Sequence, residues 1–208
     1  FATAEDELRP IMNGIFMDIF EDSVSFVASD THKLVRFKNQ GIASGVRASF
    51  ILPKKPANLL KAILPKESGK VELAFDSKNA CFKLSDFVLN CRLIEGNYPN
   101  VLRRVSVFAD AALGLAKLQL KNGELVVSTE NKDYSISAEE KVACNYTGDD
   151  LTIGFKASFL IEILNNISAT EVLVELSDPT RAGVILPLEN KENEDLLMLL
   201  MPMMLSDF

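Results

Sequence analysis

Residues 48–64 read ASFILPKKPANLLKAIL, and residues 151–167 read LTIGFKASFLIEILNNI. Each stretch opens as a short apolar run and continues with leucines and isoleucines three or four residues apart, which is the spacing of one helix face. Each stretch therefore predicts a strand followed directly by a helix, over Lys54–Leu64 in the first and Lys156–Ile167 in the second. The chain contains one structural unit twice.

Short strand-like runs surround both helices, four before each helix and three after it. The runs are Gly14–Phe20, Ser23–Ser29, Lys33–Lys38, Ala48–Leu52, Lys70–Phe75, Ala80–Leu84 and Phe87–Ile94, then Leu115–Leu120, Glu124–Thr129, Tyr134–Val142, Leu151–Phe155, Glu171–Leu176, Gly183–Leu188 and Leu196–Met203. Asn122-Gly123 between two of them is a strong hairpin signal. Sequential strands with few helices predict an α+β fold of antiparallel sheets, with domains at 1–100 and 101–208.

The two helices differ in the charge of their polar sides. The apolar side of the first is predicted to hold Leu59, Leu60, Ile63 and Leu64. Its other side carries only positive charge, on Lys54, Lys55 and Lys61. The apolar side of the second is predicted to hold Phe159, Leu160, Ile163, Leu164 and Ile167. A third helical piece is expected near Val101–Phe108, where it presents Arg103 and Arg104.

Composition and charge restrict the possible functions. The chain has 208 residues and a net charge of −7, with +1 in residues 1–100 and −8 in residues 101–208. An acidic protein does not attract nucleic acid as a whole, so any DNA contact must come from a local basic face. Three widely spaced cysteines favour reduced thiols over a disulfide framework or a zinc site. No apolar run approaches the ~18–20 residues of a membrane span.

The sequence gives no positive sign of catalysis. His32 is the single histidine, and no phosphate-binding glycine loop occurs. The acidic pairs Glu139-Glu140 and Asp149-Asp150 are typical of solvated surface charge. We therefore expect a binding or scaffolding protein that is not an enzyme and has neither cofactor nor metal.

Four stretches, in order, resemble the bacterial β sliding clamp family, the beta subunits of DNA polymerase III. They are Met12–Ile15, Ala28–Leu34, Gly154–Leu160 and Leu200–Leu205. The resemblance covers nearly the whole chain and implies the family's middle and C-terminal domains. Members of the family are processivity factors: two subunits of three domains each form a head-to-tail homodimeric ring, with helices lining the hole through which duplex DNA passes.

This sequence departs from the family pattern at several positions. Thr31 stands where Gly is usual, Lys33 and Met204 stand where Arg is usual, and Lys156 stands where Asn is usual. Ser206–Phe208 extend past the usual last residue. A stretch of the family pattern is missing at the 100/101 junction, and the family's first domain and the start of its second are absent. We expect that the chain begins inside a longer protein.

The resemblance also implies two sets of functional residues. A cleft between the domains would bind a short peptide motif of DNA polymerase subunits, the clamp loader and repair proteins. The implied cleft residues are Met12, Ser29, Thr31, His32, Lys33, Leu34, Pro99, Lys156, Phe159, Leu199, Leu200, Met201, Pro202, Met203, Met204 and Leu205. The implied DNA-facing residues are Arg9, Lys54, Lys55, Lys61, Arg103 and Arg104. The expected location is the cytoplasm, at the nucleoid, with no membrane partner.

Plainer interpretations of the same residues stay open. From the residues alone, His32 is a turn histidine, the Met-rich tail is a core strand, and the lysines form a solvated helix face. Two other functions also stay open: a peptide-binding module unrelated to DNA, and an α+β enzyme fragment that lacks its catalytic part.

Overall fold

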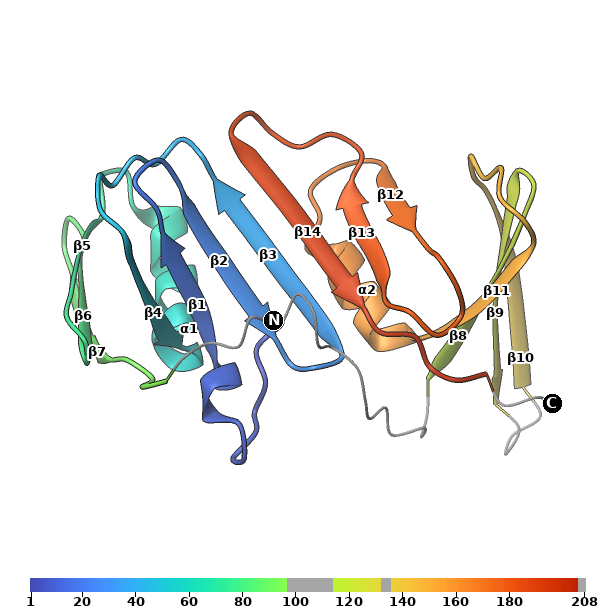
Figure 1. The fold of residues 1–208 in the computed structure, drawn as a ribbon, viewed down its shortest axis with the longest axis horizontal. Coiled ribbons are helices and arrows are strands. Elements are labelled where there is room, and N and C mark those ends of the chain that lie inside the picture. Colours follow the sequence, from blue (N-terminus) through green and yellow to red (C-terminus); the bar gives the residue numbers. More distant parts are fainter. Residues whose placement is uncertain (97–113, 132–135, 206–208) are drawn as a thin grey trace. The chain divides into compact units, whose positions relative to one another are not determined.

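The computed structural model describes residues 1–96, 114–131 and 136–205 (Figure 1). The chain divides into two compact units. The first contains Phe1–Arg104 together with Asn190–Leu196, and the second contains Val105–Glu189 together with Leu197–Phe208. The expected boundary at 100/101 lies outside the described residues and stays a prediction, as does the helix near Val101–Phe108.

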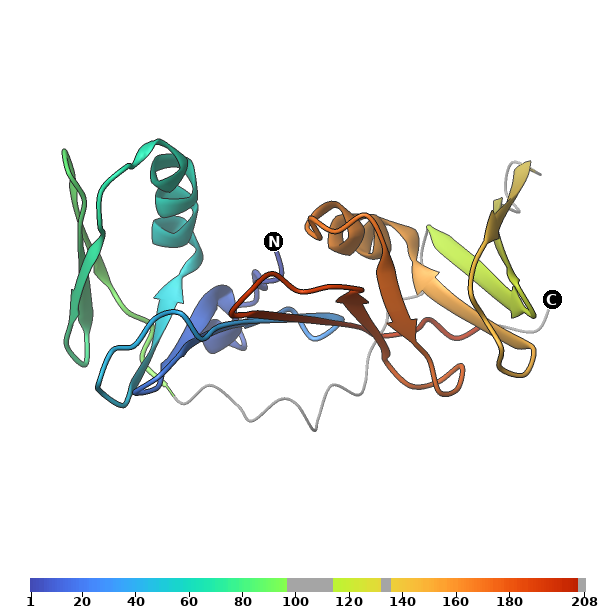
Figure 2. The same cartoon turned by 90° about the horizontal axis from the view of Figure 1, so that it is seen from above.

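Within its described residues, the first unit contains two antiparallel sheets and one α-helix (Figures 1 and 2). Its strands pair in the orders β3-β2-β1-β4 and β5-β6-β7. Its elements are η1 (Pro10–Asn13), β1 (Gly14–Ile19), β2 (Val24–Ser29), β3 (Lys33–Asn39), β4 (Ala48–Pro53), α1 (Lys54–Ile63), η2 (Leu64–Lys66), β5 (Glu72–Phe75), β6 (Asn79–Lys83) and β7 (Val88–Arg92).

The second unit repeats this plan. Its strands pair in the orders β10-β9-β8-β11 and β12-β13-β14, and the first residues of β14 belong to the segment grouped with the first unit. Its elements are β8 (Leu115–Lys121), β9 (Glu124–Asn131), β10 (Ile136–Ala143), β11 (Leu151–Lys156), α2 (Ala157–Asn165), β12 (Val172–Glu175), β13 (Gly183–Pro187) and β14 (Glu194–Leu200). The predicted α+β fold with antiparallel sheets is confirmed.

The core of the first unit lies where α1 and both sheets meet. Leu60 of α1 packs with Leu52 of β4 and Phe82 of β6 in one buried cluster. The rings of Phe50 and Phe75 add a tilted contact with centroids 4.9 Å apart. Full burial of a side chain of this size is worth about 1.5–3 kcal/mol, so this cluster is the main support of the unit.

The helix faces differ in part from the prediction. In α1, Leu60 is buried, but Leu59 is 45% exposed and Leu64, just after the helix, is 41% exposed. In α2, Ile163 is buried while Leu164 is 40% exposed. The predicted apolar sides are thus too wide, because a helix buries only the residues that a neighbouring sheet covers. No helix among the described residues is long and apolar enough to cross a membrane.

The carboxylate of Glu67, the residue directly after η2, holds this end of the helical segment to the turn between β6 and β7. Glu67 accepts the backbone N–H of Gly69 at 2.9 Å, the backbone N–H of Ser85 at 2.8 Å and the Ser85 hydroxyl at 2.6 Å. The Ser85 hydroxyl, followed by the backbone N–H groups, lowers the pKa of Glu67 from 4.5 to about 2. The ionised form is therefore the one that ties these segments together.

This interaction makes stability depend on pH in a defined direction. Because the folded pKa lies below the ordinary one, the contribution is complete above pH 4.5 and is lost as the pH falls toward about 2. Melting temperatures of wild type and Glu67→Gln should differ at about pH 6 and converge near pH 2. Ser85→Ala, which keeps the carboxylate, should show a weaker dependence. A wild-type advantage that stays constant down to about pH 2 contradicts the assignment. The effect should be small, because the carboxylate is exposed.

Candidate functional site

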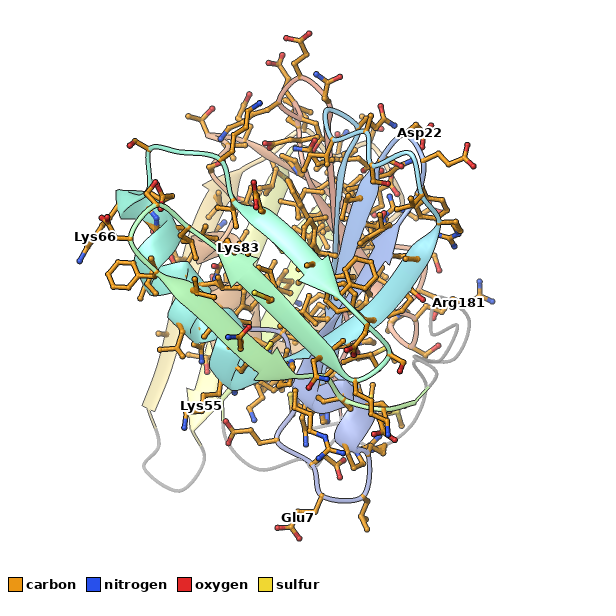
Figure 3. All side chains as sticks on the ribbon, turned by 90° about the vertical axis from the view of Figure 1, so that its left-hand side faces the viewer. Glu7, Asp22, Lys55, Lys66, Lys83 and Arg181 are labelled. Carbon is orange, nitrogen blue, oxygen red and sulfur yellow. The ribbon has the colours of Figure 1, made fainter. Side chains whose placement is uncertain are left out.

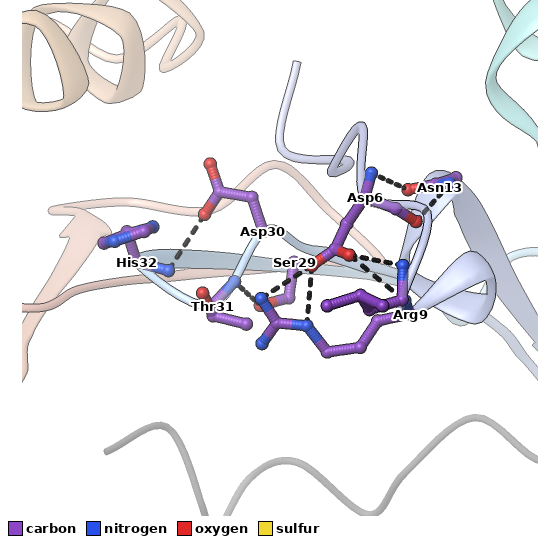
Figure 4. A network of polar contacts seen from close by, with 8 residues as sticks. Asp6, Arg9, Asn13, Ser29, Asp30, Thr31 and His32 are labelled. Carbon is purple, nitrogen blue, oxygen red and sulfur yellow. Dashed lines mark hydrogen bonds and ion pairs between the residues drawn. The ribbon is translucent and has the colours of Figure 1, made fainter. Parts of the chain in front are cut away.

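The turn between β2 and β3 holds Thr31 and His32 (Figure 4), and Lys33 begins β3 directly after it. All three are predicted site residues. Ser29 ends β2 and is fully buried. Its hydroxyl donates to the Lys33 carbonyl at 3.0 Å and accepts the Thr31 N–H at 3.1 Å. The hydroxyl thus closes the turn from inside, and Ser29 supports its backbone.

Asp30 organises the rest of this turn. Its Oδ1 accepts the N–H groups of His32 at 3.0 Å and Lys33 at 2.9 Å. Its Oδ2 receives the Lys33 ammonium at 2.7 Å, and Lys33 is only 4% exposed. Sequence reasoning missed Asp30 as a site residue. The signal was available, since Asp at the start of a turn binds backbone N–H groups two residues on.

Thr31 has a backbone conformation that suits glycine. Its φ is 81°, in the left-handed region that β-branched residues avoid. This geometry explains why the family pattern has Gly at this position. An L-residue there costs roughly 1–2 kcal/mol, so this chain carries local strain next to His32.

A second ordered loop leads into β1. Met12 in η1 is buried, and its carbonyl accepts the Ala4 N–H at 2.9 Å. The Asp6 carboxylate accepts the Arg9 N–H at 3.2 Å and pairs with the Arg9 guanidinium at 2.7 Å (Figure 4). Hydrogen bonds from Arg9, then from the Leu8 N–H, lower the pKa of Asp6. Arg9 is thus a surface cation that already has a carboxylate partner.

In the second unit, the tail of the chain lies against β11. The Met203 N–H donates to the Gly154 carbonyl at 2.7 Å. A Cβ at Gly154 would come within 2.8 Å of Leu205 Cδ2 and 3.2 Å of the Met203 carbonyl oxygen. A larger residue at this position in β11 would have to displace the Leu205 side chain and press on the tail backbone, so glycine suits the close approach of the tail.

The start of α2 is next to this contact in the sequence. Lys156 occupies the N-cap position of α2, and its ammonium lies 4.6 Å from the ring centroid of Phe159. In the tail, Leu200 is fully buried and Met204 is 87% exposed. Leu199, Met201, Pro202, Met203 and Leu205 are half-buried. The second unit thus presents a cation, a ring and several flexible thioether or aliphatic side chains.

The basic residues of α1 are not equivalent. Lys54 donates to the Glu5 carboxylate at 2.7 Å, and this hydrogen bond, with the charge of Lys54, lowers the pKa of Glu5. Lys55 and Lys61 are exposed, and Figure 3 shows Lys55 projecting from the helix. Lys55 and Lys61 are thus exposed cations of the polar side of α1, whereas Lys54 has a negative partner in Glu5, which lies outside the helix.

The other predicted site residues lie in separate parts of the chain. Leu34 of β3 is buried, as Ser29 and Met12 are, in the first unit. Pro99, Arg103 and Arg104 lie outside the described residues. Lys156, Phe159 and the tail belong to the second unit, apart in sequence from the His32 turn. Within the described ranges, no three His, Cys, Asp or Glu side chains gather where they could hold a metal ion.

Comparisons with known proteins point to one family. The family model of the DNA polymerase III beta subunit, central domain, matches residues 1–100, and that of the C-terminal domain matches residues 94–204. The beta sliding clamp of Treponema pallidum is 28% identical over 229 residues, covering 98% of this chain and 61% of the relative. That of Pseudomonas aeruginosa is 25% identical over 228 residues, covering 99% and 61%.

Solved structures agree with the sequence matches. A crystal structure of the Pseudomonas aeruginosa sliding clamp with ligand has a TM-score of 0.86 at 26% identity, over 99% of this chain and 61% of that one. The Bartonella birtlesii sliding clamp bound to griselimycin has a TM-score of 0.85 at 27% identity, over 99% and 61%. The chain thus spans about three fifths of these relatives, and its fold is that of the sliding clamps.

Both family models together cover most of the described residues, and they match the two structural repeats in order. The chain belongs to the DNA polymerase III beta subunit family.

The strained turn gives a direct test of the described geometry. Thr31→Gly should raise the free energy of unfolding by about 0.5–1 kcal/mol, because relief of the left-handed strain exceeds the entropic cost of glycine. Urea denaturation measures the change. Asn193→Gly is the matched control, since Asn193 has a φ of 63° but Asn tolerates this region. A Thr31→Gly variant that is no more stable than the control variant argues against strain at this turn.

Proposed function

We propose that the chain is part of a ring-forming processivity factor that encircles duplex DNA and docks DNA polymerases and repair proteins. One observation supports this proposal above all. The models of the family's central and C-terminal domains match this chain one after the other, and the two structural units have the same order of strands and α-helix. In this proposal the protein has no catalytic step of its own. It acts in the cytoplasm, at the nucleoid, and its full-length form is a head-to-tail homodimer.

The proposed docking site takes a short linear peptide of the Gln-Leu-x-Leu-Phe type. Two structures of relatives support it, since one was solved with a ligand and another with griselimycin. The tail side chains suit several partners, because unbranched thioethers adapt to different apolar surfaces. The clamp loader, polymerase subunits and repair proteins would share this site through the same motif.

The proposed DNA contact is weak and independent of sequence. Lys55 and Lys61 are exposed on α1 of a chain with net charge −7, so phosphates meet a local basic face on an acidic body. Contacts to phosphate position a protein without reading bases. Because a closed ring holds DNA topologically, low affinity is sufficient, and it permits sliding.

The peptide site can be tested by shortening the tail. Fluorescence anisotropy with labelled Gln-Leu-Ser-Leu-Phe should give a micromolar Kd, or about −8 kcal/mol. Deleting residues 203–208 should abolish binding, because the deletion removes the Met203 bond to Gly154 and the apolar tail side chains. The control is the chain that ends at Leu205. If the chain without residues 203–208 binds as tightly as the control, the tail is not part of the peptide site.

The DNA face can be tested through salt dependence. Replacing Lys54, Lys55 and Lys61 with Ala should weaken binding to duplexes of any sequence and lower the log–log salt slope by about 0.9 for each phosphate that the variant no longer neutralises. Lys54→Ala alone should have a smaller effect than Lys55→Ala, since Glu5 already offsets Lys54.

Lys83→Ala is the matched control, because Lys83 is exposed on β6, between the buried core residues Phe82 and Leu84 (Figure 3). An unchanged salt slope in the triple variant would show that the lysines form only a solvated face. Loss of peptide binding in that variant would show that α1 belongs to the docking surface instead.

A further inference from the structure

We infer that Asp30 is a positioning residue, which holds the backbone of the β2–β3 turn at His32 in place for a bound peptide. This inference rests on the proposed function, and on the family resemblance that implies Thr31, His32 and Lys33 as residues of the peptide site. None of the comparisons assigns a role to Asp30. The contacts of Asp30 within the turn support this role.

Asp30 binds the backbone of the turn. One carboxylate oxygen of Asp30 accepts two successive N–H groups, those of His32 and Lys33, at 3.0 and 2.9 Å. These bonds fix the plane of the peptide group that leads into His32. Thr31, immediately before it, has a φ of 81°, which an unconstrained threonine avoids. The carboxylate therefore holds the chain in a shape that its own residues disfavour.

Asp30 also forms an ion pair with Lys33. The other oxygen of Asp30 binds the Lys33 ammonium at 2.7 Å, and the side chains are only 16% and 4% exposed, respectively. Losing either partner of such a buried pair is strongly destabilising. The ion pair thus resists any rotation of Asp30 that would release the His32 N–H. Lys33 acts through Asp30 in this scheme, and its ammonium is directed inward.

Hydrogen bonds also join the end of β2 to the start of β3. Ser29, fully buried, donates to the Lys33 carbonyl at 3.0 Å, and the Asp30 N–H donates to the same carbonyl at 3.3 Å. Both ends of the turn are therefore anchored to the sheet. His32 lies between these anchors, so the position of its backbone follows from contacts that no ligand needs to supply. A preorganised turn of this kind loses less entropy when a peptide binds.

The experiment separates positioning from folding. Asp30→Ala alone removes a close partner of the buried Lys33 ammonium, so a lower affinity could come from reduced stability as well as from lost positioning. The double variant Asp30→Ala/Lys33→Met removes both charges and keeps an apolar chain in place of the lysine stem. We expect it to fold with a melting temperature near that of the wild type. Its affinity for labelled Gln-Leu-Ser-Leu-Phe should nevertheless fall at least about tenfold, because the His32 N–H no longer has its acceptor.

A matched control comes from the same unit. Asp76 accepts the N–H groups of Lys78 and Asn79, both at 2.7 Å, in the turn between β5 and β6. Asp76→Ala removes the same kind of turn interaction outside the proposed peptide site, so its peptide affinity should stay within about twofold of wild type. Because His32 is the single histidine, its imidazole NMR signals report the turn directly. They should move in the double variant without peptide and stay in place in Asp76→Ala.

The outcomes are distinct. If the wild-type chain does not bind the peptide, the proposed function fails and this inference fails with it. If the wild type binds and the folded double variant binds equally well, the docking function stands and Asp30 has no positioning role. Reduced affinity with unmoved His32 signals also overturns the inference, since the reduction then has another cause.

Discussion

The pairing of the strand before each helix with the first strand of its own sheet determines where the rest of each unit lies. In the first unit β4 pairs with β1, from Gly14 opposite Pro53 to Ile19 opposite Ala48, and α1 begins at the next residue, Lys54. In the second unit β11 pairs with β8, and α2 begins directly after Lys156. A slip of one residue would exchange the side chains between the two faces of the sheet and misplace the three consecutive buried residues of each strand, so the register is strongly specified.

Both candidate sites depend on this register. It places Lys54, Lys55 and Lys61 on a helix whose opposite side buries Leu60 in the core. In the second unit the same pairing sets the position of Gly154, whose carbonyl accepts the Met203 N–H from the tail. The tail, Lys156 and Phe159 are thus positioned by one strand. Core packing and site geometry are not separate features of these units.

The sequence predicts the elements well because their signals are local. Apolar runs bounded by turn residues indicate each of the described strands, and the predicted start of α1, Lys54, is the residue where the helix begins. The width of the buried helix face was not predicted, as Leu59 and Leu64 show, because it depends on which sheet covers the helix. The Lys54–Glu5 pair was also missed, since its members are 49 residues apart in sequence. Thr31 was recognised as a departure from the family pattern, but only its φ of 81° reveals the strain.

Under the proposed function, the carboxylate partners of the basic residues explain how a protein can hold DNA and still move along it. Lys54 and Arg9 are each already bound to a carboxylate at 2.7 Å, from Glu5 and Asp6. An exposed ion pair contributes only about 0–1 kcal/mol, so a passing phosphate can displace the carboxylate, and the carboxylate can return with little change in free energy. The net gain from each phosphate contact is therefore small. A strong contact would have to be broken at every step along the duplex, whereas exchange between two weak partners presents no comparable barrier.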